Sequence, residues 1–550
     1  MPLDATTGPP GAGSRRAPGS FGRVDRLMQL AESLAGAWAA RARTTTTAGQ
    51  ERAILRLFGV HGIDRAGQPL AGAVVERWRV ADPHGRIGGV ALPFAMALLE
   101  YDLVPQQLAL DVAAGSVDLA MEAALLREPD RRAVAEAEAD RLAAAAVERI
   151  DANRTVRREI LSLLGEPLQP WIGMQLNEPD VDGAVEEVER LVGAGVDLVR
   201  VEIPVGRELA DRMQDAGLDV PQWQPRTRPG RPRDDAEVEP APTGSQRGLA
   251  LVRTALDEAA AERRAYARLA TAPPALGIPE GAVVAAFERI DIAEANPMVE
   301  IVDHGVDPDR ALSDHAFAHR LYRRAGTFVS IGAGPLVVAP DLSSGVPSDA
   351  ATRSGRALAL QAIATAFARH DGLAPDSVLL GALPAWLCDE PHPGTRAIAE
   401  VAVRRALFPA HPLSFEEPAL RSERAGLWLG VLTACVPFAG PSAFVLPQPS
   451  RDVPATVVRA RAATGIGAEV ATATRGRTLA GHALDHARAM VEAAVMTLER
   501  ISDEGWRAVA GEPLPVAARS RSSPASVIDR GDAFDPFAAS LGREPQPPAS

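Results

Sequence analysis

Several residues that could do chemistry stand at or just beyond the ends of short apolar segments, where α/β folds position their sites. Carboxylates and imidazoles can move protons, and the candidate catalytic residues of this kind are Glu202, Glu294 and His304. Amide, guanidinium, hydroxyl and backbone N–H groups can hold an anionic cofactor. The candidate cofactor-binding residues that carry such groups are Asn177, Arg268, Asn296, Ser330, Gly332 and Gly334.

Each kind of candidate also has a structural alternative, which the sequence leaves open. Glu202 alternates with apolar neighbours, so it could equally form an ion pair between a strand and a helix. His304 and Asp303 could act together as acid and base, or both could be solvated in a loop. Gly332 and Gly334 could bring the backbone close to a phosphate, but a tight turn after a strand explains them equally well.

No metal site is expected from the cysteines and histidines. Cys388 and Cys435 do not form a Cys-x-x-Cys pair, which argues against structural zinc and a disulfide framework. His315 and His319 have the i, i+4 spacing that can bind a metal, but the sequence offers no third ligand and favours an outer helix face. Two thiols without such pairing are typical of a reducing compartment, so we expect a cytoplasmic protein.

The charged residues limit both the chemistry and the partners. All 58 basic residues are arginine, so the chain has no lysine that could form a Schiff base. Any such amine would have to come from another chain. The net charge of −13 argues against general nucleic-acid binding, which depends on clustered basic residues. No apolar run is long enough to predict a membrane-spanning helix.

The elements that must position these residues fall into distinct regions. Residues 1–20 are rich in Gly, Pro and Ala and are expected to be a disordered tail. Residues 21–164 carry apolar residues at helical spacing, which predicts a helical accessory region. Residues 165–511 alternate short apolar strands with helices, a pattern that predicts a parallel sheet. Residues 512–550, rich in Pro, Ser and Arg, form a C-terminal extension.

This strand–helix alternation recurs often enough to favour a closed (β/α)8 barrel of the TIM type over an open sheet. Asp180 can cap the first helix of the repeat. Residues 219–247 interrupt the repeat with Pro, Arg, Asp and Glu, and we expect a disordered insertion there. The strands are expected at 171–177, 196–203, 264–270, 290–296, 327–332, 377–383, 413–417 and 443–446.

Several segments, taken in order along the chain, resemble the alpha subunits of the lysine 5,6-aminomutases. The segments are GQERAILRLFGVHGIDRAGQPLAG (49–72), DANRTVRREI (151–160), PEGAVVAAFERID (279–291), RALFPAHPL (405–413) and VIDRGDAFDPFAASLG (527–542). On these motifs the chain is identified as a divergent member of that family.

The resemblance implies an isomerase that moves a terminal amino group of lysine, or of a related basic amino acid, to the neighbouring carbon by radical chemistry. In this family the alpha subunit supplies a barrel that holds pyridoxal phosphate (PLP). A beta subunit carries adenosylcobalamin and donates the lysine that forms the aldimine with PLP. A chain without lysine agrees with that division, so we expect both cofactors to depend on a beta-like partner.

The resemblance also shows departures at positions where the family holds PLP and its substrate. An arginine and several other polar residues of the family are replaced, which removes charge-assisted donors. Two alternatives therefore stay open: a PLP-deficient paralogue that acts as a binding or regulatory subunit of a cobalamin complex, and a B12-dependent barrel enzyme that does not use PLP. The changed positions are Ile203, Glu208, Pro274, Val299, His304 and Gly334.

Overall fold

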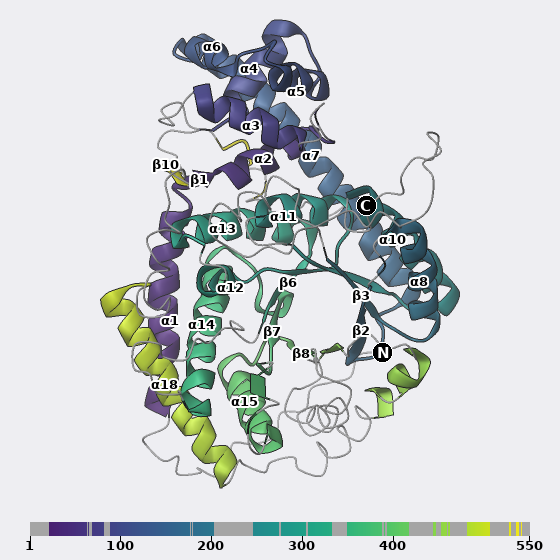
Figure 1. The fold of residues 1–550 in the computed structure, drawn as a ribbon, viewed down its shortest axis with the longest axis vertical. Coiled ribbons are helices and arrows are strands. Elements are labelled where there is room, and N and C mark those ends of the chain that lie inside the picture. The colour runs from purple at the N-terminus through teal and green to yellow at the C-terminus, as the bar shows by residue number, and fades with distance from the viewer. Residues whose placement is uncertain are drawn as a thin grey trace, which may run out of the picture.

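The computed structural model shows a closed barrel of parallel strands, ringed by helices, with a helical region stacked against one side (Figure 1). No described helix is both long and apolar enough to cross a membrane. The described residues are 21–62, 64, 69–81, 89–176, 178, 180–202, 246–273, 277–303, 306–332, 349–384, 386–387, 390, 393–416, 444–446, 453–458, 460–462, 481–506, 527–529, 535–537 and 541.

The barrel strands follow one another in sequence order, and the last one closes on the first. Each strand pairs in parallel with the next, and Trp171 lies opposite Phe444 at the closure. The predicted (β/α)8 barrel is confirmed, and each predicted strand is present with slightly different ends. The strands are β2 (Trp171–Gln175), β3 (Leu198–Glu202), β4 (Arg268–Ala272), β5 (Ile292–Glu294), β6 (Phe328–Ile331), β7 (Val378–Gly381), β8 (Leu413–Glu416) and β9 (Phe444–Leu446).

The helices around the barrel begin where the sequence offers a cap. Asp180, Asp307 and Asp349 each accept a hydrogen bond from a first-turn amide, at 3.0, 3.1 and 2.7 Å. The predicted cap at Asp180 is thus confirmed. The helices are α8 (Val181–Gly193), α10 (Gln246–Arg263), α11 (Ile278–Phe287), α12 (Pro297–Val302), α13 (Pro308–Ala325), α14 (Ala350–His370), α15 (Pro393–Leu407) and α18 (His482–Glu504), with a 3-10 turn at Pro375–Ser377.

The helices that precede the barrel fall into two groups: some pack on the outside of the barrel, and the others stack beyond α2. The first helix, α1, lies along α14 and α18 on the outside of the barrel, and α2 packs on α11 (Figure 1). The remaining ones stack beyond α2, apart from α7, which runs back to the barrel. They are α1 (Phe21–Ala42), α2 (Ala48–Leu57), α3 (Leu70–Ala81), α4 (Ala91–Tyr101), α5 (Pro105–Ala114), α6 (Leu119–Leu125) and α7 (Pro129–Leu164).

The second half of α7 binds the carboxyl ends of two barrel helices. Asn153 donates to the carbonyl of Phe287 at the end of α11, at 2.7 Å. Arg157 donates to the carbonyls of Ala325 and Gly326 at the end of α13, at 2.8 and 2.9 Å. These carbonyls lack partners within their own helices. These polar contacts, which make no apolar stripe, hold the second half of α7 in place as far as Leu164.

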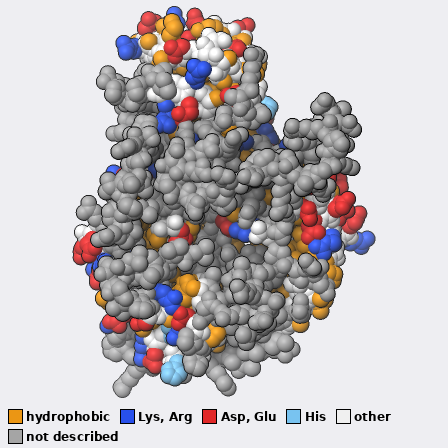
Figure 2. All heavy atoms as spheres, in the orientation of Figure 1, with side chains coloured by type: hydrophobic (Ala, Val, Ile, Leu, Met, Phe, Trp, Pro, Cys, Tyr) orange, Lys and Arg blue, Asp and Glu red, His pale blue; other side chains and the backbone are white. Residues whose placement is uncertain are grey.

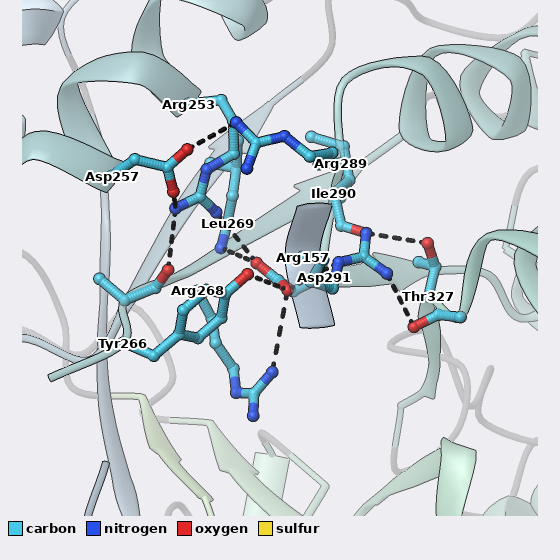
Figure 3. Close-up of polar contacts among 12 residues, drawn as sticks. Arg157, Arg253, Asp257, Tyr266, Arg268, Leu269, Arg289, Ile290, Asp291 and Thr327 are labelled. Carbon is cyan, nitrogen blue, oxygen red and sulfur yellow. Dashed lines mark hydrogen bonds and ion pairs between the residues drawn. The ribbon is translucent and has the colours of Figure 1, made fainter. Parts of the chain in front are cut away.

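Asp291 is the centre of a buried network at the amino end of β5 (Figure 3). Its carboxylate accepts from the Tyr266 hydroxyl at 2.8 Å and from the Leu269 amide at 2.9 Å. Three guanidinium groups complete the shell, and together these donors offset the desolvation of a buried charge. The arginines and their nitrogen–oxygen distances to Asp291 are Arg253 (3.1 Å), Arg157 (3.2 Å) and Arg268 (3.8 Å).

Residues near the C-terminus join the N-terminal part of the chain to the barrel. β1 (Thr45–Thr47) pairs antiparallel with β10 (Val527–Asp529). Asp535 accepts a hydrogen bond from Arg320 of α13 at 2.8 Å, and Phe537 is fully buried. The last segment that resembles the family, 527–542, therefore holds the N-terminal part of the chain and the barrel together.

Candidate functional site

The lumen of the barrel has an apolar floor. Side chains of a strand alternate between the lumen and the surrounding helices. Outward residues such as Val199 and Val329 join the large core under the helices, whereas the inward ones form a separate buried cluster. This cluster near the amino ends of the strands, the apolar floor, consists of Trp171, Leu198, Ala270, Ile292 and Leu379, with Phe328 packed against it.

The inward positions further along the same strands form a polar chamber at the carboxyl ends of the strands, the mouth of the barrel. The chamber residues are either polar or very small, in contrast with the bulky residues that usually fill a barrel layer. Small residues at several of these positions put few bulky side chains in the layer above the floor. By strand alternation and register, the chamber residues are Gly173, Gln175, Arg200, Ala272, Glu294, Ser330, Gly381 and Ser414.

Arg200 and Glu294 form a two-point ion pair across this chamber. Arg200 Nε binds Glu294 Oε1, and Arg200 Nη2 binds Glu294 Oε2 at 2.8 Å. Arg200 Nη1 also donates to Gln175 Oε1 at 3.1 Å. The pair spans from β3 to β5 over β4, where Ala272 offers almost no bulk. Figure 2 shows acidic and basic side chains next to one another over the middle of the barrel.

The pair is neither sealed in the core nor fully solvated. The Arg200 side chain is 25% exposed and the Glu294 side chain 30% exposed. Both charges can therefore be reached from the chamber while the low-dielectric barrel wall still strengthens their attraction. On β8, across the lumen from this pair, the buried Ser414 hydroxyl has no hydrogen-bond partner among the described residues. A buried hydroxyl of this kind can complete its hydrogen bonds with a ligand.

The structure brings some sequence candidates together and separates others. Glu294 and Ser330 lie opposite each other in register on β5 and β6. Asn296 caps α12 by accepting from the Met298 amide at 3.0 Å, and its buried Nδ2 has no partner among the described residues. The Gly332 carbonyl accepts from Gln361 at 2.9 Å. Glu202 ends β3, and its side chain lies outside the described residues, as do Asn177, His304 and Gly334.

The expected position of Arg268 at the carboxyl end of its strand is wrong. β4 begins at Arg268, so this residue lies at the amino end. Its guanidinium stands 3.8 Å from the centre of the Trp171 ring and binds Glu166. The strand begins later than predicted because Tyr266 and the residues around it belong to the Asp291 network. Sequence reasoning did not single out Arg200 or Gln175, although their inward parity with the floor residues is a signal.

The expected outer face for His315 and His319 is also wrong. Both are buried: His315 lies 3.5 Å from Glu300 of α12, and the His319 ring packs against Phe367 of α14. His319 Nδ1 lies 2.8 Å from Asp371, and burial lowers the pKa of its imidazole against the pull of that carboxylate. Within the described chain, no three His, Cys, Asp or Glu side chains are grouped so as to hold a metal.

An arginine-rich cluster, the rim cluster, stands at the start of α14 and α15, on the mouth side of the barrel. Arg353 and Arg396 both bind the Glu390 carboxylate, one to each oxygen. The Arg353 guanidinium stacks on Trp386 at 4.4 Å. Two arginines share the Glu390 carboxylate, and the amino ends of two helices add positive potential, while Asp349 caps the first turn of α14. The rim cluster can attract an anionic group.

Comparison with known proteins matches this architecture to one family. The model of the D-lysine 5,6-aminomutase TIM-barrel domain of the alpha subunit matches residues 20–224 and 233–426. The chain belongs to this family. A lysine 5,6-aminomutase alpha subunit from Fusobacterium nucleatum is 25% identical over 72% of this chain and 71% of its own length. One from Acetoanaerobium sticklandii is 24% identical over 68% of this chain and 66% of its own length.

Solved structures that the chain matches in part include a dihydropteroate synthase from Burkholderia cenocepacia. That structure overlaps 56% of this chain and 98% of its own, with 15% sequence identity and a TM-score of 0.34. Two segments that carry the sequence resemblance can be located in the structure. Segment 151–160 lies in α7, and segment 279–291 overlaps α11 and includes Asp291. Of the changed family positions, Val299 lies in α12, and Ile203, Glu208 and Pro274 lie outside the described residues.

Proposed function

We propose that the chain is the alpha-like subunit of an adenosylcobalamin- and PLP-dependent aminomutase of the cytoplasm. The reaction is the radical shift of a terminal amino group of lysine, or of a related basic amino acid, to the neighbouring carbon. Family membership supports the reaction class, and the observation that carries the proposal is the polar chamber with its Arg200–Glu294 pair at the mouth of the barrel. A substrate that carries both a positive and a negative group needs a binding site with charges of both signs.

A beta-like partner is part of this proposal. The chain has no lysine, so a lysine that holds PLP must come from a second subunit. The names of the relatives, as alpha subunits, support the same assembly. The partner would carry adenosylcobalamin to the mouth, where the chamber opens.

The described residues fit the phosphate of PLP at the rim cluster. A phosphate dianion needs charge-assisted donors, and Arg353 and Arg396 supply guanidinium groups. Bound PLP would supply an electron-delocalising ring beside the migrating amino group. This chain would contribute the rim donors, the charges of the chamber that orient the substrate, and the apolar floor that keeps water out from below.

Equilibrium dialysis with PLP and with pyridoxal, which lacks the phosphate, tests this proposal in the complex of the chain with its partner. We expect PLP to be retained and the double variant Arg353→Gln/Arg396→Gln to weaken PLP binding at least about tenfold, since charged hydrogen bonds contribute about 1.5–3 kcal/mol each. Pyridoxal binding should change little.

Arg369→Gln is the matched control, because Arg369 lies at the other end of α14 and pairs with Glu32 at 2.7 Å. This variant should bind PLP like the unmodified chain. A complex that retains cobalamin but not PLP would overturn the aminomutase proposal in favour of a B12 barrel that does not use PLP. A complex that binds neither cofactor would favour a non-catalytic paralogue.

A further inference from the structure

We propose that Arg200 and Glu294 together bind the head group of an α-amino acid, with Arg200 holding its carboxylate and Glu294 its ammonium group. This inference rests on the proposed function and specifies which end of the substrate the chamber recognises. Its basis is one accessible ion pair in a lumen whose neighbouring inward positions are small.

The spacing of the pair matches a head group. Arg200 Nη2 and Glu294 Oε2 are 2.8 Å apart, so the two charges lie side by side. An α-amino acid carries its carboxylate and ammonium on one carbon, and these groups are adjacent in the same way. The two ends of lysine are separated by its whole side chain. A single pair in contact therefore complements the head group, whereas an ammonium and a carboxylate at opposite ends of a ligand cannot both reach it.

Exchange of partners lets the ligand enter without leaving a charge unpaired. In the chain as described, Glu294 neutralises Arg200 across the chamber. When a zwitterion binds, its carboxylate takes the place of Glu294 on the guanidinium, and its ammonium takes the place of Arg200 on the carboxylate. Each buried charge keeps an opposite neighbour, and this avoids the cost of an isolated charge in a low-dielectric site. A ligand with one charge could replace only one half of this ion pair.

The floor fixes the direction of the rest of the ligand. Trp171, Ile292 and Leu379 fill the lumen below the pair. A bound amino acid can therefore extend only toward the mouth, away from the floor. Its terminal amino group would then point to the face that a partner subunit can approach, so the pair would position the reacting end by holding the other end.

Ligand selectivity provides the test, measured by isothermal titration calorimetry on the full chain and on its complex. The probes are L-lysine, L-norleucine (head group, no terminal amine), 6-aminohexanoate (no α-ammonium) and 1,5-diaminopentane (no carboxylate). We expect L-lysine and L-norleucine to bind, and the other two to bind at least about tenfold more weakly, because one charged contact contributes about 1.5–3 kcal/mol.

Two single variants assign the roles. Arg200→Gln and Glu294→Gln should each weaken the binding of L-norleucine at least about tenfold. Arg190→Gln, which changes an exposed arginine on α8 that pairs with Glu187, should leave binding unchanged. Because each single variant leaves one charge without its partner, the double variant Arg200→Gln/Glu294→Gln is measured as well, and circular dichroism confirms that it is folded.

Three results would overturn the inference. One is L-norleucine binding that survives in the folded double variant, which would make the pair purely structural. Another is 6-aminohexanoate binding as tightly as L-norleucine. The third is a complex that retains PLP but binds neither L-lysine nor L-norleucine, and this result would leave the proposed cofactor use standing while removing the head-group assignment.

Discussion

The amino end of the barrel and the chamber at its mouth both pair a carboxylate with arginine, but the first pairing is buried and the second is partly exposed. At the amino end, Asp291 is enclosed by three arginines, a tyrosine hydroxyl and a backbone amide. In the chamber, Glu294 has Arg200 as its charged partner, and both side chains are partly exposed. A carboxylate bound by many residues is held in place, whereas a carboxylate with one charged partner can exchange that partner for a ligand.

The largest effect is expected from removal of the Asp291 carboxylate. Asp291→Ala leaves Arg253 and Arg268 buried without their central counter-charge, and we expect the free energy of unfolding to fall by about 3–5 kcal/mol. Urea denaturation measures this change. Glu187→Ala, which breaks an exposed pair with Arg190, is the control and should cost under about 1 kcal/mol. Equal losses of unfolding free energy in the two variants would show that the Asp291 carboxylate contributes no more than one exposed ion pair, which would contradict its role as the locked centre of the amino end.

A pH experiment on Asp314 tests what happens to a buried carboxylate that has few donors. Burial raises its pKa from 3.8 to about 6, although Arg310 and the Thr47 hydroxyl oppose the shift. The folded chain then binds this proton more tightly than the unfolded chain does. The contribution to stability is therefore complete below about pH 4 and is lost as the pH rises through about 6.

Asp314→Asn should remove that dependence. The difference in unfolding free energy between the variant and the unmodified chain should grow in favour of the variant by about 2 kcal/mol from pH 4 to pH 7, at about 1.4 kcal/mol for each tenfold change in proton affinity. Glu189→Gln, at an exposed position on α8, controls for the loss of one acid. A difference that stays flat with pH would show that Asp314 is as well compensated as Asp291.

Arg157→Ala should show how much the link between α7 and the barrel contributes, including its ion pair with Asp291. The variant frees the carbonyls of Ala325 and Gly326, and we expect a loss of about 2 kcal/mol in the free energy of unfolding. Arg158 is the next residue and is exposed, so Arg158→Ala provides a matched control with a near-zero effect. If Arg158→Ala is as destabilising as Arg157→Ala, the contacts at the helix ends do not account for the loss.

The smallest effect is expected in the chamber itself. Arg200→Gln/Glu294→Gln removes both charges of a partly exposed pair, so the free energy of unfolding should change by no more than about 1 kcal/mol in either direction. Thermal and urea unfolding check this. A loss as large as that of Asp291→Ala would mean that the pair holds the barrel together, and the contrast between its two ends would disappear.

The fold could be predicted from the sequence because strand and helix periodicity are local signals. The run 171–177 and the cap at Asp180 are legible without tertiary information, and β2 and α8 lie there. The candidate site was only partly predictable. Glu294 and Ser330 lie at the ends of apolar strands. Their position relative to Arg200 depends on the register between strands, which no local sequence pattern encodes. Arg268 was misplaced because the start of β4 is set by the buried contacts of Tyr266.

The pairing of β1 with β10 has a consequence for how the chain acquires its structure. Thr45 lies opposite Asp529, so this contact joins segments from the two ends of the described chain. At a synthesis rate of about 5–20 residues per second, β1 leaves the ribosome about 25–100 seconds before its partner strand exists. For most of that interval α1 also lacks α18, against which it packs. The contacts of highest sequence separation thus form last, and they place the slow steps of folding at the seam where the chain closes on itself.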